Sequence, residues 1–137
     1  MILYFRQIQF VGNGTSMTRY CKVCGTTYGL EVHHICYRSQ NPHLVNCKLN
    51  FVDLCYIHHR DSRKGVHFNK ELDRKLKLEL QNKLEELLIN DYLTKEEINE
   101  VLQISEKALN RLLKTLTLHN DKYVKEDVIR ACMIRKY

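Results

Sequence analysis

The strongest constraint on the fold is a set of cysteine and histidine residues between positions 21 and 59. Two residues separate Cys21 from Cys24, and two residues also separate Cys55 from His58. A tetrahedral zinc ion takes four Cys or His ligands, and a two-residue spacing brings two of them onto one tight turn. The two pairs therefore predict one zinc site formed by Cys21, Cys24, Cys55 and His58.

Two other assignments of the zinc ligands stay open. His58 and His59 are adjacent and could exchange roles, although His58 keeps the two-residue spacing of the second pair. Cys36 and Cys47 could compete for the metal, although neither belongs to such a pair. The sixth cysteine, Cys132, is expected to pack in a core. The six cysteines as a group favour metal binding in an intracellular chain over a disulfide framework.

The segment between the two pairs predicts two short strands joined by a loop. Residues 30–35 form an apolar strand that carries His33 and His34, residues 36–49 form a loop, and residues 51–54 form the returning strand. Side chains alternate across a strand, so the two histidines face opposite ways. One of them can bind a metal while the other faces a substrate.

A helix that begins near Cys55 separates the two histidines that follow it. Residues three apart share a helix face, so Cys55 and His58 lie together, whereas His59 is turned away by about 100°. The second pair can therefore serve one metal while His59 serves another.

These residues together resemble the HNH endonucleases, members of the ββα-metal (His-Me finger) nuclease class. The family pattern runs Cys-x-x-Cys-Gly, a strand ending in Asp-His or His-His, an Asn before a second strand, and Leu-Cys-x-x-Cys-His. The chain supplies, in that order, Cys21, Cys24, Gly25, His33, His34, Asn50, Leu54, Cys55 and His59. It departs at His58, where a fourth Cys is usual, and at His33, where many members have Asp. The likeness covers residues 19–68, about half of the chain, and is greatest to the small HNH proteins of phages and mobile elements.

The resemblance implies a metal-dependent endonuclease that hydrolyses DNA to 5′-phosphate and 3′-hydroxyl ends. His34 would be the general base, His33 and His59 would hold one catalytic divalent cation, and Asn50 would fix the loop and the orientation of His34. Two imidazoles favour Mn²⁺, Ni²⁺ or Zn²⁺ over Mg²⁺, whereas cellular availability favours Mg²⁺. The zinc bound by the cysteines would be structural, because a core of about 50 residues is too small to fold without support.

Four further residues bear on this interpretation, and two alternative functions stay open beside it. His43, His67 and His119 are expected to be ordinary surface or core histidines, although His67 could reach the metal or a phosphate. Arg38 is a candidate phosphate anchor. One alternative function is a catalytically inactive zinc-finger DNA-binding protein of the same fold. Another is a nuclease acting on RNA, which no platform of aromatic-rich strands supports.

The second half of the chain predicts helices. Residues 69–90 form a long polar helix with an apolar stripe, which packs on the nuclease core or forms a homodimer. The stripe consists of Leu72, Leu76, Leu80, Leu84, Leu87 and Leu88. A capping box at residues 94–97 starts a helix to about residue 102, Ser105 starts a second to about residue 115, and a third follows near residues 125–133. This order resembles the helix-turn-helix plan.

The second of these short helices has the two faces that a DNA-recognition helix needs. Leucines at helical spacing form its inner face: Leu109, Leu112, Leu113 and Leu116. Its outer face carries Lys107, Asn110, Arg111 and Lys114, which predicts contacts with DNA. Simple packing or dimerisation is the alternative.

Charge divides the chain in a similar way. Residues 1–68 hold eight basic and three acidic residues, a net charge of +5, and residues 104–137 hold eight and four, a net charge of +4. Residues 69–103 between them hold six and nine, a net charge of −3. Two basic ends predict two surfaces that face a polyanion such as DNA.

The expected fold class is α+β, with a small zinc-stapled ββα-metal nuclease core and an α-helical tail of helix-turn-helix character. The expected divisions are a nuclease domain at 1–68, a linker helix at 69–92 and a DNA-binding tail at 93–137. Residues 2–11 read as a further strand, although Met17 could be an alternative start. No apolar run approaches the roughly 20 residues that cross a bilayer, so we expect a cytoplasmic protein, in the host cytoplasm if it is phage-encoded.

Overall fold

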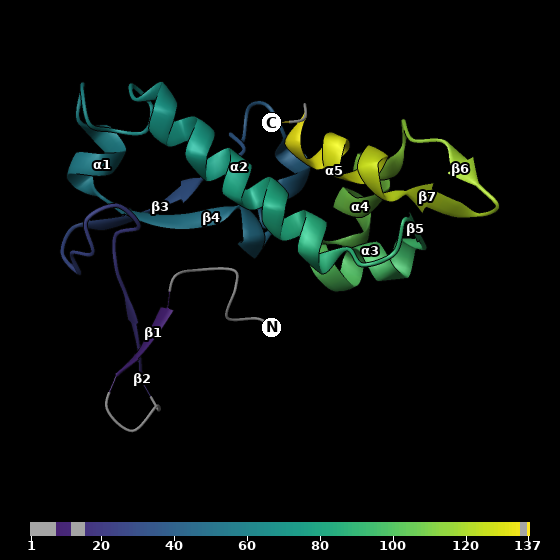
Figure 1. The fold of residues 1–137 in the computed structure, drawn as a ribbon, viewed down its shortest axis with the longest axis horizontal. Helices are drawn as coiled ribbons and strands as arrows, with labels where there is room; N and C mark the ends of the chain where they lie inside the picture. The colour runs from purple at the N-terminus through teal and green to yellow at the C-terminus, as the bar shows by residue number, and fades with distance from the viewer. Residues whose placement is uncertain (1–7, 12–15, 135–136) are drawn as a thin grey trace.

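A computed structural model describes residues 8–11, 16–134 and 137 of the chain (Figure 1). Over these residues the protein is a small α+β structure with five α-helices and three small antiparallel sheets. The first sheet is a hairpin of β1 (Ile8–Val11) and β2 (Ser16–Arg19), which projects from the rest of the molecule (Figure 1). The strand expected over residues 2–11 is thus found at 8–11, and its earlier part lies outside the described residues.

The second sheet carries the histidine pair. Strand β3 (Leu30–His34) pairs with β4 (Phe51–Cys55), so that His34 lies opposite Phe51. Helix α1 (Tyr56–Arg60) begins directly after β4. This strand–strand–helix order agrees with the expectation from the apolar runs and from the spacing of the second ligand pair.

The connection between β3 and β4 is more ordered than the predicted loop. It contains two 3₁₀ helices, η2 (Pro42–Leu44) and η3 (Lys48–Asn50). Proline at the first helical position of η2 suits such a turn, because its backbone has no N–H to leave unpaired. Leu44 and Leu49 are buried, so we call residues 35–50 the β3–β4 connection and treat it as part of the core.

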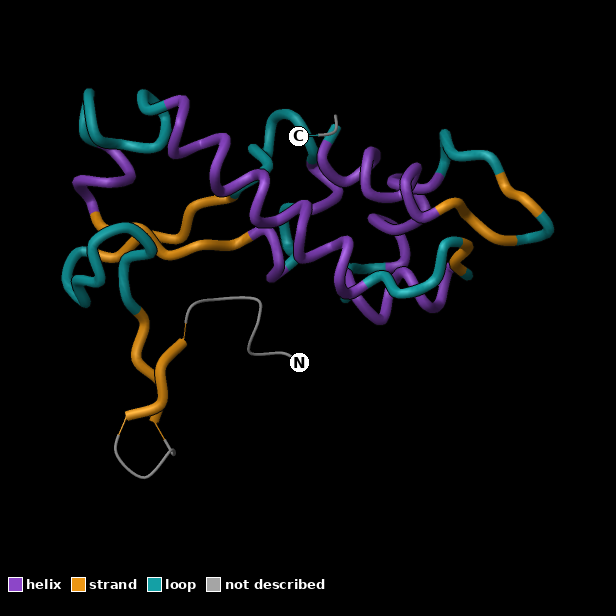
Figure 2. Tube along the Cα trace, in the orientation of Figure 1, coloured by secondary structure: helices purple, strands orange, loops and turns teal. Residues whose placement is uncertain are grey.

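Helix α2 (Lys70–Leu87) runs along the long axis of the molecule (Figures 1 and 2). It lies against both halves of the molecule, namely the half before it, which carries the histidine pair, and the tail after it. Its N-cap is Asn69, whose side chain accepts a hydrogen bond from the Leu72 N–H. The predicted apolar stripe faces inward. Its members Leu76, Leu80, Leu84 and Leu88 are buried within the single chain, while Leu72 and Leu87 are partly buried.

The tail contains the three predicted helices, α3 (Lys95–Leu102), α4 (Glu106–Leu113) and α5 (Lys125–Met133). Thr94 and Ser105 cap α3 and α4, each accepting a hydrogen bond from the N–H three residues later. The tail also forms a small sheet that was not predicted. Its strands are β5 (Tyr92–Leu93), β6 (Leu118–His119) and β7 (Lys122–Val124), in the order β5-β7-β6.

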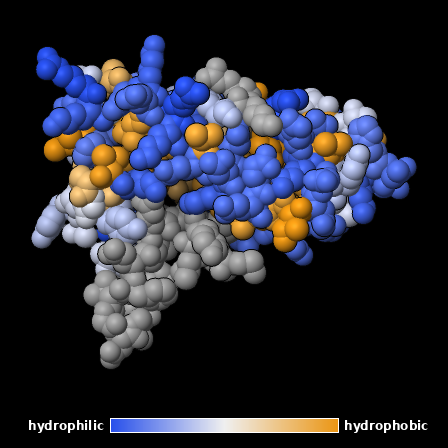
Figure 3. All heavy atoms as spheres, viewed as in Figure 1, coloured by the Kyte–Doolittle hydropathy of each residue, from blue (hydrophilic) through white to orange (hydrophobic). Residues whose placement is uncertain are grey.

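The tail packs directly on the half that carries the histidines. The Asn41 amide of the β3–β4 connection donates hydrogen bonds to the carbonyl oxygens of Ala131 and Cys132 in α5. The Cys47 thiol donates to the Leu102 carbonyl at the end of α3. One hydrophobic core therefore runs through both halves, while hydrophilic residues cover most of the face seen in Figure 3. Across the residues that the structure describes, no helix combines the length and apolar character needed to cross a membrane.

Candidate functional site

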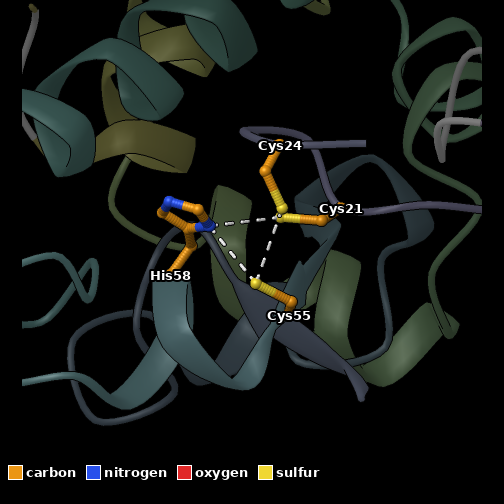
Figure 4. A group of neighbouring side chains, drawn as sticks. All are labelled: Cys21, Cys24, Cys55 and His58. Carbon is orange, nitrogen blue, oxygen red and sulfur yellow. Dashed lines mark hydrogen bonds between the residues drawn. The ribbon is translucent and has the colours of Figure 1, made fainter. Parts of the chain in front are cut away.

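The four predicted zinc ligands meet at one end of the β3–β4 sheet (Figure 4). Cys21 and Cys24 come from the turn after β2, Cys55 ends β4, and His58 lies in α1. All four ligand atoms lie within 4.8 Å of one another. His58, rather than His59, is the histidine of this cluster, as its two-residue spacing predicted.

The distances in this cluster fit a zinc ion. The Cys24 and Cys55 sulfur atoms are 3.8 Å apart, and His58 Nδ1 lies 3.8 Å from Cys21 Sγ and 3.2 Å from Cys55 Sγ. A tetrahedral ion with Zn–S bonds of about 2.3 Å would hold two sulfurs about 3.8 Å apart. None of the six cysteines forms a disulfide. The four residues could therefore hold a metal ion such as structural zinc.

The Cys21 thiol is prepared for metal binding by the backbone around it. Burial alone would raise its pKa, but hydrogen bonds from the Cys24, Cys55 and Val23 backbone outweigh burial and lower the pKa. The Val23 N–H lies 3.4 Å from the Cys21 sulfur. A lowered pKa favours the thiolate, which is the form that binds metal.

An ion pair between the exposed Arg19 and the buried Asp53 ties this turn to the sheet. The Arg19 guanidinium donates to both carboxylate oxygens of Asp53, at 2.6 Å and 3.0 Å, and Asp53 is fully buried in β4. The backbone N–H of Lys22 also donates to the Asp53 carbonyl. A bidentate arginine–carboxylate pair of this kind fixes the orientation of the two side chains as well as their position. It therefore holds the turn with Cys21 and Cys24 close to Cys55 and His58.

A second cluster lies beside the first and consists of His33, His59 and His67. We call these three residues the histidine cluster. Their nearest ring nitrogens are within 4.8 Å of one another, and each pair of ring centroids is 5.2 or 5.3 Å apart. The predicted pair of His33 and His59 is thus brought together, and His67 joins them.

His33 has the features of a metal ligand. Only 3% of it is exposed, and its Nε2 atom has no hydrogen-bond partner among the described residues. Burial lowers its pKa to about 3, with further lowering by His59 and His67, so the imidazole is neutral at pH 7 and can donate a lone pair. The donor set therefore fits a divalent transition metal.

His59 is oriented by a carboxylate. Its Nδ1 lies 2.9 Å from Glu31 Oε1, and Arg60 also donates to the Glu31 carboxylate. The hydrogen bonds from Arg60 and then His59 lower the Glu31 pKa to about 2, so the carboxylate is charged. Histidines that bind metals usually donate their second ring N–H to such a carboxylate.

Tyr37 and helix α2 support the other side of the histidine cluster. The Tyr37 ring lies against His33 and His67, and its hydroxyl donates to Asp73 at 3.0 Å. Burial and Asp73 raise the Tyr37 pKa to about 12. Lys77 pairs with Asp73 at 2.8 Å and lies over the Tyr37 ring. The β3–β4 connection, through Tyr37, and helix α2 therefore support the histidine cluster together.

His67 was expected to be an ordinary histidine, with the alternative that it reaches the metal or a phosphate. It reaches the cluster because the chain turns back after α1, with the Gly65 N–H donating to the Asp61 carbonyl and Val66 N–H to the His58 carbonyl. A Cβ at Gly65 would lie 2.5 Å from the Asp61 oxygen. The glycine that permits this turn was the one available sequence signal.

His34 lies outside the histidine cluster, as strand alternation predicted. Its Nε2 is 3.0 Å from the Val45 carbonyl oxygen. A carbonyl only accepts hydrogen bonds, so Nε2 carries the proton and Nδ1 is the basic nitrogen of the neutral ring. The side chain is half-buried and can be reached by solvent.

Asn50 holds the two ends of the β3–β4 connection together. It is 1% exposed, its Oδ1 accepts from the Cys36 N–H, and its Nδ2 donates to the carbonyls of Cys36 and Leu44. Its own backbone carbonyl accepts from the N–H of Ile35, next to His34. These contacts are consistent with the expected role of fixing the loop beside His34.

The predicted DNA-contacting residues lie on the surface. Arg38 is exposed in the β3–β4 connection. Four more are exposed on α4 or at its C-cap: Lys107, Asn110, Arg111 and Lys114. The inner face is packed as predicted, with Leu109, Leu112 and Leu113 buried. Helix α4 therefore has a buried leucine face and an exposed polar face.

Comparisons of this chain with protein-family models, with curated proteins and with solved structures gave no match.

Proposed function

We propose that the protein is a metal-dependent endonuclease of the HNH type, which hydrolyses phosphodiester bonds of DNA to 5′-phosphate and 3′-hydroxyl ends. One observation carries the proposal. The buried His33, whose Nε2 has no hydrogen-bond partner in the described part of the chain, clusters with two other histidines, and the next residue along the same strand is a histidine with a fixed tautomer. Metal ligands and a general base on opposite faces of one strand are the parts that phosphodiester hydrolysis requires.

His34 acts as the general base in this proposal. The Val45 carbonyl keeps the proton on Nε2, so Nδ1 can take a proton from the attacking water. Asn50 keeps the backbone next to His34 in place through its contacts with Cys36 and Ile35.

The histidine cluster would hold the catalytic cation. His33, His59 and His67 would be its ligands, with His59 oriented by Glu31. A divalent ion there would supply positive charge to the scissile phosphate and to the leaving 3′-oxygen. Three neutral imidazoles favour Mn²⁺, Ni²⁺ or Zn²⁺ over Mg²⁺ on ligand softness.

The other cluster would hold structural zinc, and the strand–strand–helix unit would be a ββα-metal fold. With four protein ligands the zinc has no open position, as is usual for a structural site. Its ligands join the turn after β2, the end of β4 and helix α1, a helix that has no buried residue. Zinc would thereby fix α1, and with it His59.

The tail would bind DNA through the exposed face of α4. Its basic and amide side chains project from a helix whose opposite side is buried, as a recognition helix requires. The net charge of +4 over residues 104–137 would favour binding to DNA of any sequence, through contacts with the phosphates.

The decisive test is nicking of supercoiled plasmid by the zinc-loaded protein with added Mn²⁺, Ni²⁺ or Mg²⁺. The wild type is expected to nick the plasmid, and His34→Ala to lose on the order of 10²–10⁴-fold in rate. His119→Ala is the matched control, because His119 is exposed in the β6–β7 hairpin and its loss should not change the rate.

Three outcomes would redirect the proposal. If the wild type binds DNA but cuts it with none of the three metals, the protein is a catalytically inactive zinc-finger DNA-binding protein. Faster cleavage of single-stranded RNA than of duplex DNA would identify an RNA nuclease. Full activity in His34→Ala would remove His34 as the base.

A further inference from the structure

The β3–β4 connection bridges the proposed general base and the tail. In the middle of this connection, the Val45 carbonyl accepts the hydrogen bond from His34 Nε2 at 3.0 Å. Shortly before it in the sequence, Asn41 enters the packed interface with helix α5. Only η2 (Pro42–Leu44) separates these two residues in the sequence, so any displacement of Asn41 is transmitted over a very short length of chain.

Asn41 binds the end of α5 through both hydrogens of its amide. Its Nδ2 donates to the Cys132 carbonyl at 2.6 Å and to the Ala131 carbonyl at 3.2 Å. The last four carbonyls of an α-helix have no partner within the helix, so these bonds supply partners that the helix itself does not provide. Carbonyls cannot donate, which fixes the orientation of the amide.

The segment from Asn41 to Val45 is itself rigid. The Asn41 carbonyl accepts from the Leu44 N–H, and the Pro42 carbonyl accepts from the Val45 N–H. Leu44 is 2% exposed, and its carbonyl accepts a hydrogen bond from Asn50. We call residues 41–45 the strut, because this turn is a short rigid segment between the end of α5 and the Val45 carbonyl that holds His34.

From this geometry we propose that Asn41 is a positioning residue, which uses the C-terminal end of α5 to hold the Val45 carbonyl against His34. The inference rests on the proposed role of His34 as the general base. It gives the tail a part in the chemistry besides DNA binding, because the tail supplies the anchor for the strut. A shift of α5 on DNA binding would reach His34 by the same route.

The buried state of Asn41 fits such a role. The side chain is 2% exposed, and its Oδ1 has no hydrogen-bond partner among the described residues. Burying an unpaired amide oxygen costs stability. An apolar side chain would avoid that cost but would leave the two α5 carbonyls without their donor.

The test compares Asn41→Ala and Asn41→Ser in the full, zinc-loaded chain, with Gln40→Ala as the matched control. Gln40 is the exposed neighbour of Asn41 in the same turn. The first readout is the Nε2–H signal of His34 in spectra of protein with ¹⁵N-labelled histidine, assigned with His34→Ala. The second readout is kcat and KM for plasmid nicking.

In the wild type and Gln40→Ala, the His34 Nε2–H should exchange slowly with water because Val45 protects it. In Asn41→Ala that signal should broaden or vanish while the signals of the histidine cluster stay unchanged. The kcat should fall by about 10- to 100-fold at unchanged KM, as expected when a catalytic group is misplaced by about 1 Å. Asn41→Ser keeps one donor and should give an intermediate effect.

Two results would overturn the inference. One is a folded Asn41→Ala protein whose His34 signal and kcat match those of Gln40→Ala. If Asn41→Ala does not fold, Asn41→Ser decides, and an unchanged His34 signal in that variant refutes the strut. The spectra do not depend on cleavage, so a protein without nuclease activity but with a sensitive His34 signal would refute the proposed function and leave the strut standing.

Discussion

The Nδ1 atom of His59 lies 2.9 Å from Oε1 of Glu31. This contact occupies one ring nitrogen and leaves Nε2 as the atom that can bind a metal. The Glu31 carboxylate is also held by Arg60 at 2.8 Å, so the orientation of the imidazole is fixed before any metal arrives. The histidine cluster is therefore preorganised at His59.

Glu31→Gln should weaken binding of Mn²⁺ at the histidine cluster. The amide keeps the size of the carboxylate but loses its charge, and loss of such a partner typically costs about 10- to 100-fold in metal affinity. Titration calorimetry of the zinc-loaded protein measures the change. Glu71→Gln, an exposed glutamate in the first turn of α2, is the control, and equal affinities in the two variants would contradict the role of Glu31.

His67→Ala should also lower the Mn²⁺ affinity, by a larger factor than His43→Ala. His67 contributes a nitrogen to the cluster, whereas His43 lies in η2 and outside it. Excess Mn²⁺ should partly restore nicking by His67→Ala, because the proposed general base, His34, is unchanged. Tight binding of Mn²⁺ and full activity in this variant would reduce the site to His33 and His59.

Cys21→Ser should lower zinc content and stability together. Serine is a poor zinc ligand, and the binding energy of a structural zinc is also folding energy. Zinc per chain can be measured by atomic emission, and stability by urea unfolding. Cys36→Ser is the control, because Cys36 is buried but lies outside the cluster; it should retain one zinc. A folded, active Cys21→Ser protein without zinc would rule the site out.

The stability of the zinc-loaded protein without the second metal should fall as the pH drops below about 6.5, the ordinary pKa of histidine. Burial lowers the pKa of His33 to about 3, so the unfolded chain binds a proton that the folded chain excludes. The neutral form therefore stabilises the fold above pH 6.5, and this contribution declines steadily as the pH falls toward 3.

Urea unfolding of the wild type and of His33→Gln at pH 7.5 and pH 5.5 measures this effect. The glutamine variant cannot titrate, so it should lose less stability between the two values. Zinc content must be equal in all four samples, because zinc ligands also titrate. The same loss in both proteins would show that His33 does not cause it.

The double change Arg111→Ala and Lys114→Ala should weaken DNA binding and flatten its salt dependence. Removing one phosphate-binding side chain should reduce the slope of log K against log salt by roughly one unit. Fluorescence anisotropy at several salt concentrations measures both quantities. Residual metal-dependent nicking should survive, because the proposed catalytic residues are unchanged.

The control for this double change is Lys70→Ala with Arg74→Ala, two exposed basic residues of α2. That pair removes the same charge from another face. If both double variants lower affinity and slope equally, the effect of α4 is a general one of net charge. Unchanged affinity and slope in the α4 variant would make the tail a packing element.

Most of the arrangement of the candidate metal ligands could be predicted because it depends on local spacing. The pairs Cys21–Cys24 and Cys55–His58 need only a turn and a helix to form, and strand alternation was enough to separate His33 from His34. The helix caps at Thr94 and Ser105 could also be predicted from the sequence, because a cap is a contact between residues three apart.

The missed features depend on contacts that are distant in the sequence or on very short elements. His67 reaches the histidine cluster through a turn whose only signal is Gly65. The strands β5, β6 and β7 have two or three residues each, too few to show an alternating pattern. The Asn41 contact with Cys132 spans 91 positions, and nothing in the local sequence around either residue indicates the other.

Helix α2 lies along both halves of the molecule, and the β3–β4 connection is packed against α3 and α5. The tail is thus not a detachable module in the sense used by protein engineers. A chimera that exchanges residues 93–137 for another DNA-binding unit, in order to redirect cleavage, would leave Asn41 and the inner face of α2 without their partners. A successful exchange would have to carry the β3–β4 connection and the buried leucines of α2 along with the new tail.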